Sequence, residues 1–317
     1  MSDLRSYADG LGCAYIGGAI DVPSVSVGCV TRAEDRTGLT LLLFAPGSRG
    51  AVDVAGGAPA TRETDLLRPE NLIQGPDAIL LTGGSAFGLR AADGAMQALA
   101  KAGRGAAFGG AHVPIVPAAA IFDLGVGSPL APTVEDGETA AAAALHGGNE
   151  VPEGPCGAGC GATVGKVLGP LRAMRGGQGA VTLQAPDGLR VGALAVVNAV
   201  GSVLAPEGTV VAGPLHEDGR PGRASEWIAS GEAGRGRPGE ATTIACVATN
   251  ACLGQAELQR VARMAHDGLG RAVDPAHTLF DGDVIFCVSC GDLPADASRV
   301  GVLAAAAVAE AILRAVR

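Results

Sequence analysis

Short apolar runs that end in glycine recur along this chain and limit what it can fold into. Glycine occupies 50 of the 317 positions, more than twice the usual share of roughly 7%. The glycines follow no three-residue period and 48% of the residues are hydrophobic, which excludes a collagen-like or disordered chain. We therefore expect a globular protein with many tight turns, long enough for two domains or for one large sandwich.

Charge and composition argue against two classes of partner. A net charge of −9 and an aromatic content of 3% provide little of the basic and stacking surface that nucleic acids require. The longest apolar runs, 191–205 and 300–309, are shorter than the roughly 20 residues of a membrane-spanning helix. The N-terminus shows no basic segment followed by an apolar one, so we expect no secretory signal and a cytoplasmic location.

The first part of the chain predicts strands that alternate with helices. Two apolar runs, 37–44 and 77–82, have the length and the flanking turn signals of buried strands. Residues 87–102 show near-helical spacing of apolar side chains, and 140–145 belong to a second expected helix. The glycine-punctuated region 157–203 predicts several further strands of a buried sheet.

The C-terminal part predicts a β-α-β-α unit that follows a flexible loop. Residues 216–240 contain six glycines, two prolines and nine charged side chains, which is typical of a solvated loop. A strand is expected at 242–249 and an amphipathic helix around 258–269. A second strand at 283–289 and an alanine-rich helix at 298–316 complete the unit.

One segment resembles a phosphate-binding loop but lacks its key residues. In GAGCGATVGK, residues 157–166, Cys160 stands where the first glycine is required, and Val167 replaces the hydroxyl residue after the lysine. We therefore do not expect a nucleotide site. Lys166 lies in an apolar segment expected to be a strand, where it needs a partner or a lowered pKa, unless an edge strand lets it reach solvent.

Ser85 in GGSAFG lies at an expected strand-to-helix turn, as in serine hydrolases. Their nucleophile motif requires glycine at position 87, where this chain has phenylalanine. A helix cap is the stronger interpretation, with substrate anion binding a modest alternative. A serine hydrolase that combines Ser85 with His112 or His266 stays open as a weaker alternative, because the members of a triad need only be neighbours in space.

Two cysteine pairs suggest zinc at first sight. Cys287 and Cys290 form a CxxC in an expected strand, where residues three apart point to opposite faces, and Cys156 and Cys160 form a CxxxC. The flanking residues of the first pair are typical of a core. We therefore interpret these cysteines as buried free thiols, and we expect neither a metal nor a cofactor.

The strongest chemical signal lies in the C-terminal unit. A threonine such as Thr242 whose preceding peptide bond is cut gains an α-amine with a pKa near 7.7 to 8, which can act as base for its own hydroxyl. Asp281 and Asp283 flank a glycine and can face one side of an extended segment, where they can hold an ammonium or a hydroxyl group. Taken alone, Thr242-Thr243 is more often a plain strand start and Asp-Gly-Asp a plain turn.

Seven segments together resemble one known family, the self-processing N-terminal-nucleophile (Ntn) hydrolases. That family includes the L-aminopeptidase/D-esterase-amidases, the beta-peptidyl aminopeptidases and the nylon-oligomer (6-aminohexanoate oligomer) endo-hydrolases. The similarity covers nearly the whole chain. The segments are GGAPATRETDLLRPENL (56–72), LTGGSAFGLRAADG (81–94), VPIVPAAAIFDLG (113–125), GAGCGATVGK (157–166), VGALAVVNAVG (191–201), TTIACVATNACL (242–253) and MAHDGLGRAVDPAHTLFDGDVIF (264–286).

The resemblance implies a four-layer α/β/β/α sandwich in which residues 1–317 form one Ntn-hydrolase-like domain. It further implies self-cleavage between Ala241 and Thr242, giving an α fragment, 1–241, and a β fragment, 242–317, that stay associated. The assembly it implies is a homo-oligomer, a tetramer in this family. The implied activity is that of an amide hydrolase or aminopeptidase acting on short peptides, small amides or amide oligomers.

The same resemblance implies the site residues. Thr242 is the nucleophile, and Lys166 and Asn198 lie beside it with Asp281 and Asp283 in the same network, most like the nylon-oligomer branch. In this scheme Lys166 lowers the pKa of the Thr242 amine, Asn198 donates to the oxyanion, and the aspartates orient the amine and the lysine.

One position departs from the family pattern. Relatives commonly carry asparagine or glycine before the nucleophile, whereas this chain has Ala241. Self-cleavage depends more on a strained, accessible carbonyl than on this side chain, so we expect processing to occur, although slowly. The alternative from a different class is an unprocessed binding or scaffold protein that keeps the fold without the reaction.

Overall fold

The two strands of the C-terminal unit lie in the middle of one mixed six-stranded sheet, together with strands from earlier in the chain. The computed structural model describes residues 6–232 and 240–317. Only one neighbouring pair in this sheet, β16 with β18, is parallel, and helix α5 (Gln255–Ala272) makes the crossover between them. In sheet order the strands are β1 (Ala14–Gly17), β12 (Gly177–Gln184), β13 (Arg190–Asn198), β16 (Thr242–Ala251), β18 (Val284–Leu293) and β4 (Arg49–Val54).

A second sheet comes mainly from the first 120 residues. Its outer face carries helices α2 (Ala91–Lys101) and α3 (Val134–Leu145), which follow the four-residue α1 (Ser85–Gly88) in the chain. A capping box between Thr133 and Asp136 starts α3. In sheet order the strands are β2 (Val25–Arg32), β3 (Thr37–Phe44), β6 (Ala78–Thr82), β9 (Ala118–Ala120) and β5 (Thr61–Arg62).

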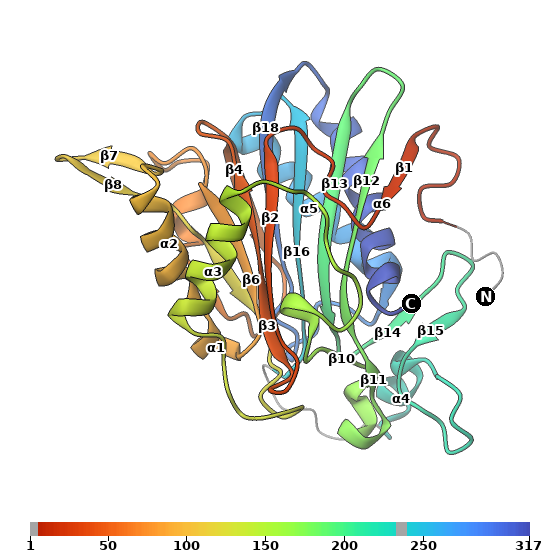
Figure 1. The fold of residues 1–317 in the computed structure, drawn as a ribbon. Coiled ribbons are helices and arrows are strands. Elements are labelled where there is room, and N and C mark those ends of the chain that lie inside the picture. The colour runs from red at the N-terminus through yellow and green to blue at the C-terminus, as the bar shows by residue number, and fades with distance from the viewer. Residues whose placement is uncertain (1–5, 233–239) are drawn as a thin grey trace.

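Strict alternation along the strands assigns their side chains to two different cores. On β16, Ile244 and Cys246 belong to the core between the two sheets, whereas Ala245 and Val247 face α5 and α6 (Ala297–Ala315). With α2 and α3 outside the other sheet, the layers run helix, sheet, sheet, helix (Figure 1). The expected α/β/β/α sandwich is confirmed.

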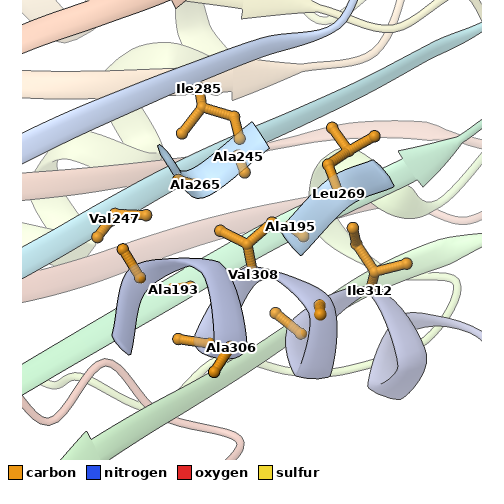
Figure 2. Packing of buried hydrophobic residues seen from close by; sticks show 14 of the residues in the cluster. Ala193, Ala195, Ala245, Val247, Ala265, Leu269, Ile285, Ala306, Val308 and Ile312 are labelled. Atoms are coloured by element: carbon orange, nitrogen blue, oxygen red, sulfur yellow. The ribbon is translucent and has the colours of Figure 1, made fainter. Parts of the chain in front are cut away.

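Small residues let the outer helices approach the six-stranded sheet closely. Figure 2 shows Ala193 and Ala195 of β13 close to Val308 of α6, and Ala245 of β16 beside Ala265 of α5. Where α5 and α6 touch, an added Cβ at Gly268 would lie 1.9 Å from the Ala305 carbonyl oxygen. The high content of glycine and alanine is thus used for close packing of layers as well as for turns.

The remaining strands are short and lie mostly around the end of the sandwich where β13 ends and β16 begins. A hairpin of β7 and β8 projects beside α2 (Figure 1). These strands are β7 (Ala106–Phe108), β8 (Ala111–Val113), β10 (Thr163–Val164), β11 (Met174–Arg175), β14 (Ser202–Leu204), β15 (Val210–Ala212) and β17 (Val273–Asp274). The 3-10 turns are η1 (Asp65–Leu67), η2 (Gly157–Gly159), η3 (Lys166–Leu168) and η4 (Pro170–Arg172).

Two local predictions were wrong. The stretch 216–240 was expected to be a loop throughout, but it contains helix α4 (Ala224–Ser230), whose Ala224 and Trp227 pack inward; residues 233–239 lie outside the described residues. Lys166 was expected within a strand, but it begins η3. The cause is Gly165, whose φ of +76° turns the chain after β10.

The expected β-α-β-α order of the C-terminal unit is confirmed by β16, α5, β18 and α6. In the part of the chain that the structure describes, no helix has the length and hydropathy needed to cross a membrane.

Two glycines of α5 test the close packing of the helices. Gly268→Ala should lower the free energy of unfolding by about 1–3 kcal/mol, because the new methyl group collides with the backbone of α6. Gly270 has no atom within 4 Å of an added Cβ, so Gly270→Ala should be neutral or stabilising by up to about 1 kcal/mol. Denaturant unfolding of both variants measures this, and equal effects would contradict the packing described.

Candidate active site

Thr242 lies at the first position of β16, at the edge of the space between the two sheets. It shares the inner face of the strand with Ile244, and only 2% of its surface is exposed. In the antiparallel register it stands directly opposite Asn198, the last residue of β13. Its hydroxyl donates a hydrogen bond to the carbonyl oxygen of Ala241. The expected nucleophile is therefore beside the peptide bond that it is expected to cut.

The Ala241 carbonyl is held from a second side by a backbone donor. The Gly282 N–H donates to it at 2.9 Å, and Ala241 forms a parallel bridge with Asp281. An N–H fixed on a carbonyl oxygen is the arrangement that stabilises a developing oxyanion. Asn198 is the oxyanion donor expected from the sequence, and the structure adds Gly282, which lies between the two aspartates, as a backbone donor to this carbonyl.

Asn198 is hydrogen-bonded to four groups of the surrounding chain. Its amide nitrogen donates to the carbonyls of Phe122, at 3.1 Å, and Glu240, at 3.4 Å. Its amide oxygen accepts from the Thr163 N–H at 3.0 Å and from the Lys166 ammonium at 2.6 Å. These contacts satisfy a fully buried amide and join β13 to the turn after β9 and to the segment before Thr242.

Lys166 points its ammonium into this cluster. Besides the Asn198 amide oxygen, Nζ donates to the carbonyls of Asn198, at 2.8 Å, and Glu240, at 2.7 Å. Burial lowers its pKa to about 7, and the negative charges of Asp281, Glu240 and Asp123 oppose the shift. Of the two alternatives left open by the sequence, the structure therefore shows the partnered lysine with a lowered pKa.

Asp283 fixes the strand just after the nucleophile. One carboxylate oxygen accepts from the Thr243 N–H at 2.7 Å. The other accepts from the N–H and the Nδ1 of His277, at 2.9 and 2.8 Å. Hydrogen bonding to this carboxylate raises the pKa of His277 despite its burial. His277, which the sequence interpretation did not single out, is thus the main side-chain partner of Asp283.

Asp281 is the second buried carboxyl of the pair. Its Oδ2 accepts from the N–H of Thr278 at 3.0 Å and from its hydroxyl at 2.6 Å. Burial and then the charge of Asp283 raise its pKa to about 6, against the opposing effect of Thr278. Backbone donors from the segment after β4 hold the same turn: Ala58 N–H binds the Asp281 carbonyl and Ala55 N–H the Asp283 carbonyl.

Asp123 is a contribution of the five-stranded sheet to the site, and the sequence analysis did not identify it. It follows β9, is 2% exposed, and accepts from the Gly84 N–H at 2.6 Å. Burial raises its pKa, while the charge of Lys166 lowers it. The sequence feature that could have identified Asp123 is its position as a carboxylate in the otherwise apolar segment 113–125. Asp123 therefore helps to balance the buried lysine from the five-stranded sheet.

The structure gives the alternative built on Ser85 no support. Ser85 begins α1 with a φ of +53°, and its N–H donates to the Ile121 carbonyl. His112 interacts with the Gly105 carbonyl and His266 with Asp53. Among the described residues, no hydrogen bond joins the Ser85 hydroxyl to a histidine.

The cysteines are thiols. All eight are free, and Cys287 and Cys290 belong to cores on opposite faces of the six-stranded sheet, as expected from the strand geometry. Burial is the main cause that raises the pKa of Cys156, Cys160 and Cys290. Across residues 6–232 and 240–317, no group of three or more His, Cys, Asp and Glu side chains is arranged to hold a metal ion.

Comparison with known proteins gives consistent matches in sequence. The model of peptidase family S58 matches residues 19–317. An uncharacterized aminopeptidase of Mycobacterium tuberculosis is 42% identical over 287 residues, which is 86% of this chain and 80% of that protein. A 6-aminohexanoate-oligomer endohydrolase of Paenarthrobacter ureafaciens is 32% identical over 322 residues, covering 93% of this chain and 84% of the endohydrolase.

Solved structures share the fold at lower identity. A beta-aminopeptidase of Burkholderia sp. superposes with a TM-score of 0.67 at 24% identity, covering 98% of this chain and 89% of the other. The L-aminopeptidase D-Ala-esterase/amidase of Ochrobactrum anthropi, described as a variant of the Ntn hydrolase fold, gives 0.61 at 18% identity, with 98% and 90% covered.

Lys166→Met tests the buried charge through the pH dependence of stability. The pKa of Lys166 is about 7 in the folded chain and 10.5 when the side chain is exposed to water in the unfolded chain, so between these values the unfolded chain binds more protons. The wild-type lysine should therefore gain stability relative to methionine as pH rises from about 7 to about 9. The difference in Tm between the lysine and the methionine protein, measured as a function of pH, tests this. Both proteins carry Thr242→Val to prevent the expected self-cleavage.

The exposed Lys101 is the matched control, and its replacement by methionine should show no such trend. A Lys166→Met difference that stays constant across this pH range would contradict a lowered pKa.

Proposed function

Because the chain belongs to peptidase family S58, we propose that Thr242 cuts the chain before itself and then serves as the N-terminal nucleophile. The family and the relatives show that the protein is a hydrolase of peptide or amide bonds. One observation carries the assignment to Thr242: its hydroxyl adjoins the Ala241 carbonyl, which the Gly282 N–H holds at 2.9 Å. In this proposal the nucleophile, its target and the oxyanion donor are already assembled in the uncut chain.

Self-cleavage follows from this arrangement. The Thr242 oxygen attacks the Ala241 carbonyl carbon, and its proton passes to the Thr242 nitrogen as the C–N bond breaks. The products are an ester between Ala241 and the Thr242 oxygen and a free α-amine on Thr242. Water then hydrolyses the ester, which leaves the Ala241 carboxyl group and restores the hydroxyl.

The mature site uses the new amine as its base. The Thr242 oxygen attacks a substrate amide while the α-amine takes the proton and passes it to the leaving amine, and water completes the cycle by hydrolysing the acyl-enzyme. The Lys166 ammonium lowers the pKa of this amine by repulsion, which keeps it neutral at lower pH. Asp281 and Asp283 hold the turn and the strand that carry the oxyanion donor and the nucleophile.

The fragments have a structural reason to stay together. Fragment 242–317 supplies β16 and β18 from the middle of the six-stranded sheet, together with α5 and α6. Their separation from fragment 1–241 would expose the cores on both faces of that sheet. We propose that the two fragments form one domain after cleavage.

The relatives suggest the substrate class. One named relative is an aminopeptidase and another acts on 6-aminohexanoate oligomers. We propose that this enzyme likewise hydrolyses short peptides, small amides or amide oligomers. A homo-tetramer in the cytoplasm is part of the same proposal; the eight free thiols suit a reducing compartment, and light scattering of the purified enzyme measures the assembly.

Two adjacent threonines provide the decisive test of self-cleavage. Wild-type protein should separate into fragments 1–241 and 242–317 in intact-mass measurements, whereas Thr242→Val should stay at full length and lose amide hydrolysis by at least about 10³-fold, as expected for loss of a nucleophile. Thr243→Val is the matched control: its hydroxyl is buried without a hydrogen-bond partner, so cleavage and activity should be retained.

The alternatives give different results. A wild-type chain that stays intact after long incubation would favour the unprocessed binding protein, for which Ala241 is the motivating feature. Activity that is lost in Ser85→Ala but retained in Thr242→Val would favour the serine hydrolase.

A further inference from the structure

The side chain of Ala241 occupies a small apolar cluster of its own. Ala241 is 2% exposed and packs with buried Val167, Val200 and Ala224. Leu168 and Trp227 border the cluster and are partly buried. The cluster is separate from the three cores that hold the layers together, and it lies directly next to the proposed scissile bond.

Its walls come from three places in the chain that all precede the cleavage point. η3 supplies Val167, the turn after β13 supplies Val200, and α4 supplies Ala224 and Trp227. The proposed self-cleavage would therefore leave these walls in the α fragment and free only the new chain end at Ala241, which fills the cluster. In the cleaved chain of this proposal, the cluster is an apolar recess beside the nucleophile.

In the proposed mechanism, self-cleavage and substrate hydrolysis pass through the same type of intermediate, which suggests a role for this recess. Both proceed through an ester on the Thr242 oxygen; Ala241 is the acyl residue in the first reaction and the substrate supplies it in the second. The carbonyl must meet the same oxyanion donor each time, so the side chain on the acyl residue points into the same surroundings.

We propose that Val167, Val200, Ala224, Leu168 and Trp227 form the acyl subsite and select substrates whose acyl residue has a small apolar side chain of about alanine size. The inference rests on Thr242 as the nucleophile of both reactions. Because all five side chains are apolar, a charged acyl side chain would lose its hydration there without gaining a partner.

The recess is too firmly held to widen for a larger side chain. The Ala224 N–H donates to the Ser202 hydroxyl at 2.8 Å, and that hydroxyl donates to the Gly222 carbonyl at 2.8 Å, which fixes the start of α4. The ring of His216 lies 4.8 Å from that of Trp227 and supports it from outside. A leucyl side chain would therefore have to displace packed groups.

Acyl selectivity of the processed enzyme is the first test. Glycyl, alanyl, leucyl and glutamyl p-nitroanilides are used in free and N-acetylated forms, so that both exo and endo cleavage are covered. The alanyl compounds should have a kcat/KM about tenfold or more above the leucyl and glutamyl compounds. Leucyl or glutamyl compounds that are cleaved as fast as alanyl would overturn the proposal.

Variants of two adjacent residues on α4, Trp227 and Ile228, test whether the recess causes the acyl selectivity. Trp227→Ala should narrow the alanyl-to-leucyl ratio of kcat/KM about tenfold, because it opens one wall of the recess. Ile228→Ala is the matched control: Ile228 is 41% exposed and outside the cluster, so the ratio should not change. An unchanged ratio in a folded, processed Trp227→Ala enzyme would overturn the proposal.

The rate of self-cleavage in variants of Ala241 offers a second measurement, which needs no change in α4. Ala241→Leu and Ala241→Glu should slow self-cleavage at least about tenfold, by the same steric and charge effects; cleavage at the wild-type rate in both would contradict the subsite. Failure of the proposed function gives a different result. If the wild-type protein neither releases fragment 242–317 nor hydrolyses amides, the role proposed for Thr242 is wrong. If it does both but shows no preference among acyl residues, only the subsite proposal is wrong.

Discussion

The parallel pairing of β16 with β18 is the contact on which the site depends. Because the two strands run in the same direction, the residues before them, Ala241 and Asp281, also lie side by side. That bridge aims the Gly282 N–H at the Ala241 carbonyl and brings the carboxyl pair close to Thr242. A shift of one residue in this register would turn Thr242 to the other face of the sheet, away from the gap between the layers.

Charge compensation explains how Lys166 is buried close to the buried carboxyl groups of Asp123 and Asp281. Lys166 has three oxygen acceptors for its ammonium, and Asp281, Glu240 and Asp123 oppose the cost of its burial. The result is a lysine with a pKa near 7 beside a carboxyl with a pKa near 6. Groups that titrate near neutrality can transfer protons at that pH, which agrees with the function proposed for this site.

Much of the fold was predictable because local periodicity reports burial. The run 37–44 has the bounds of β3, and β16 begins at Thr242 as expected. The errors fall where local pattern and tertiary packing disagree. Polar composition predicted a loop where α4 forms, since Trp227 and Ala224 find apolar partners that lie far away in the sequence. Lys166 was assigned to a strand because a glycine with positive φ gives no periodic signal.

The sequence by itself determined the alternation of layers, the free thiols and the residue types available for an N-terminal-nucleophile reaction, because these depend on local spacing, composition and resemblance. Only the tertiary structure decided which atoms meet. It placed the Gly282 N–H on the Ala241 carbonyl, paired Asp283 with His277, and added Asp123 from the other sheet. The physical reason is that hydrogen bonds and buried charges select partners by distance and direction, and those exist only once strands distant in sequence are paired.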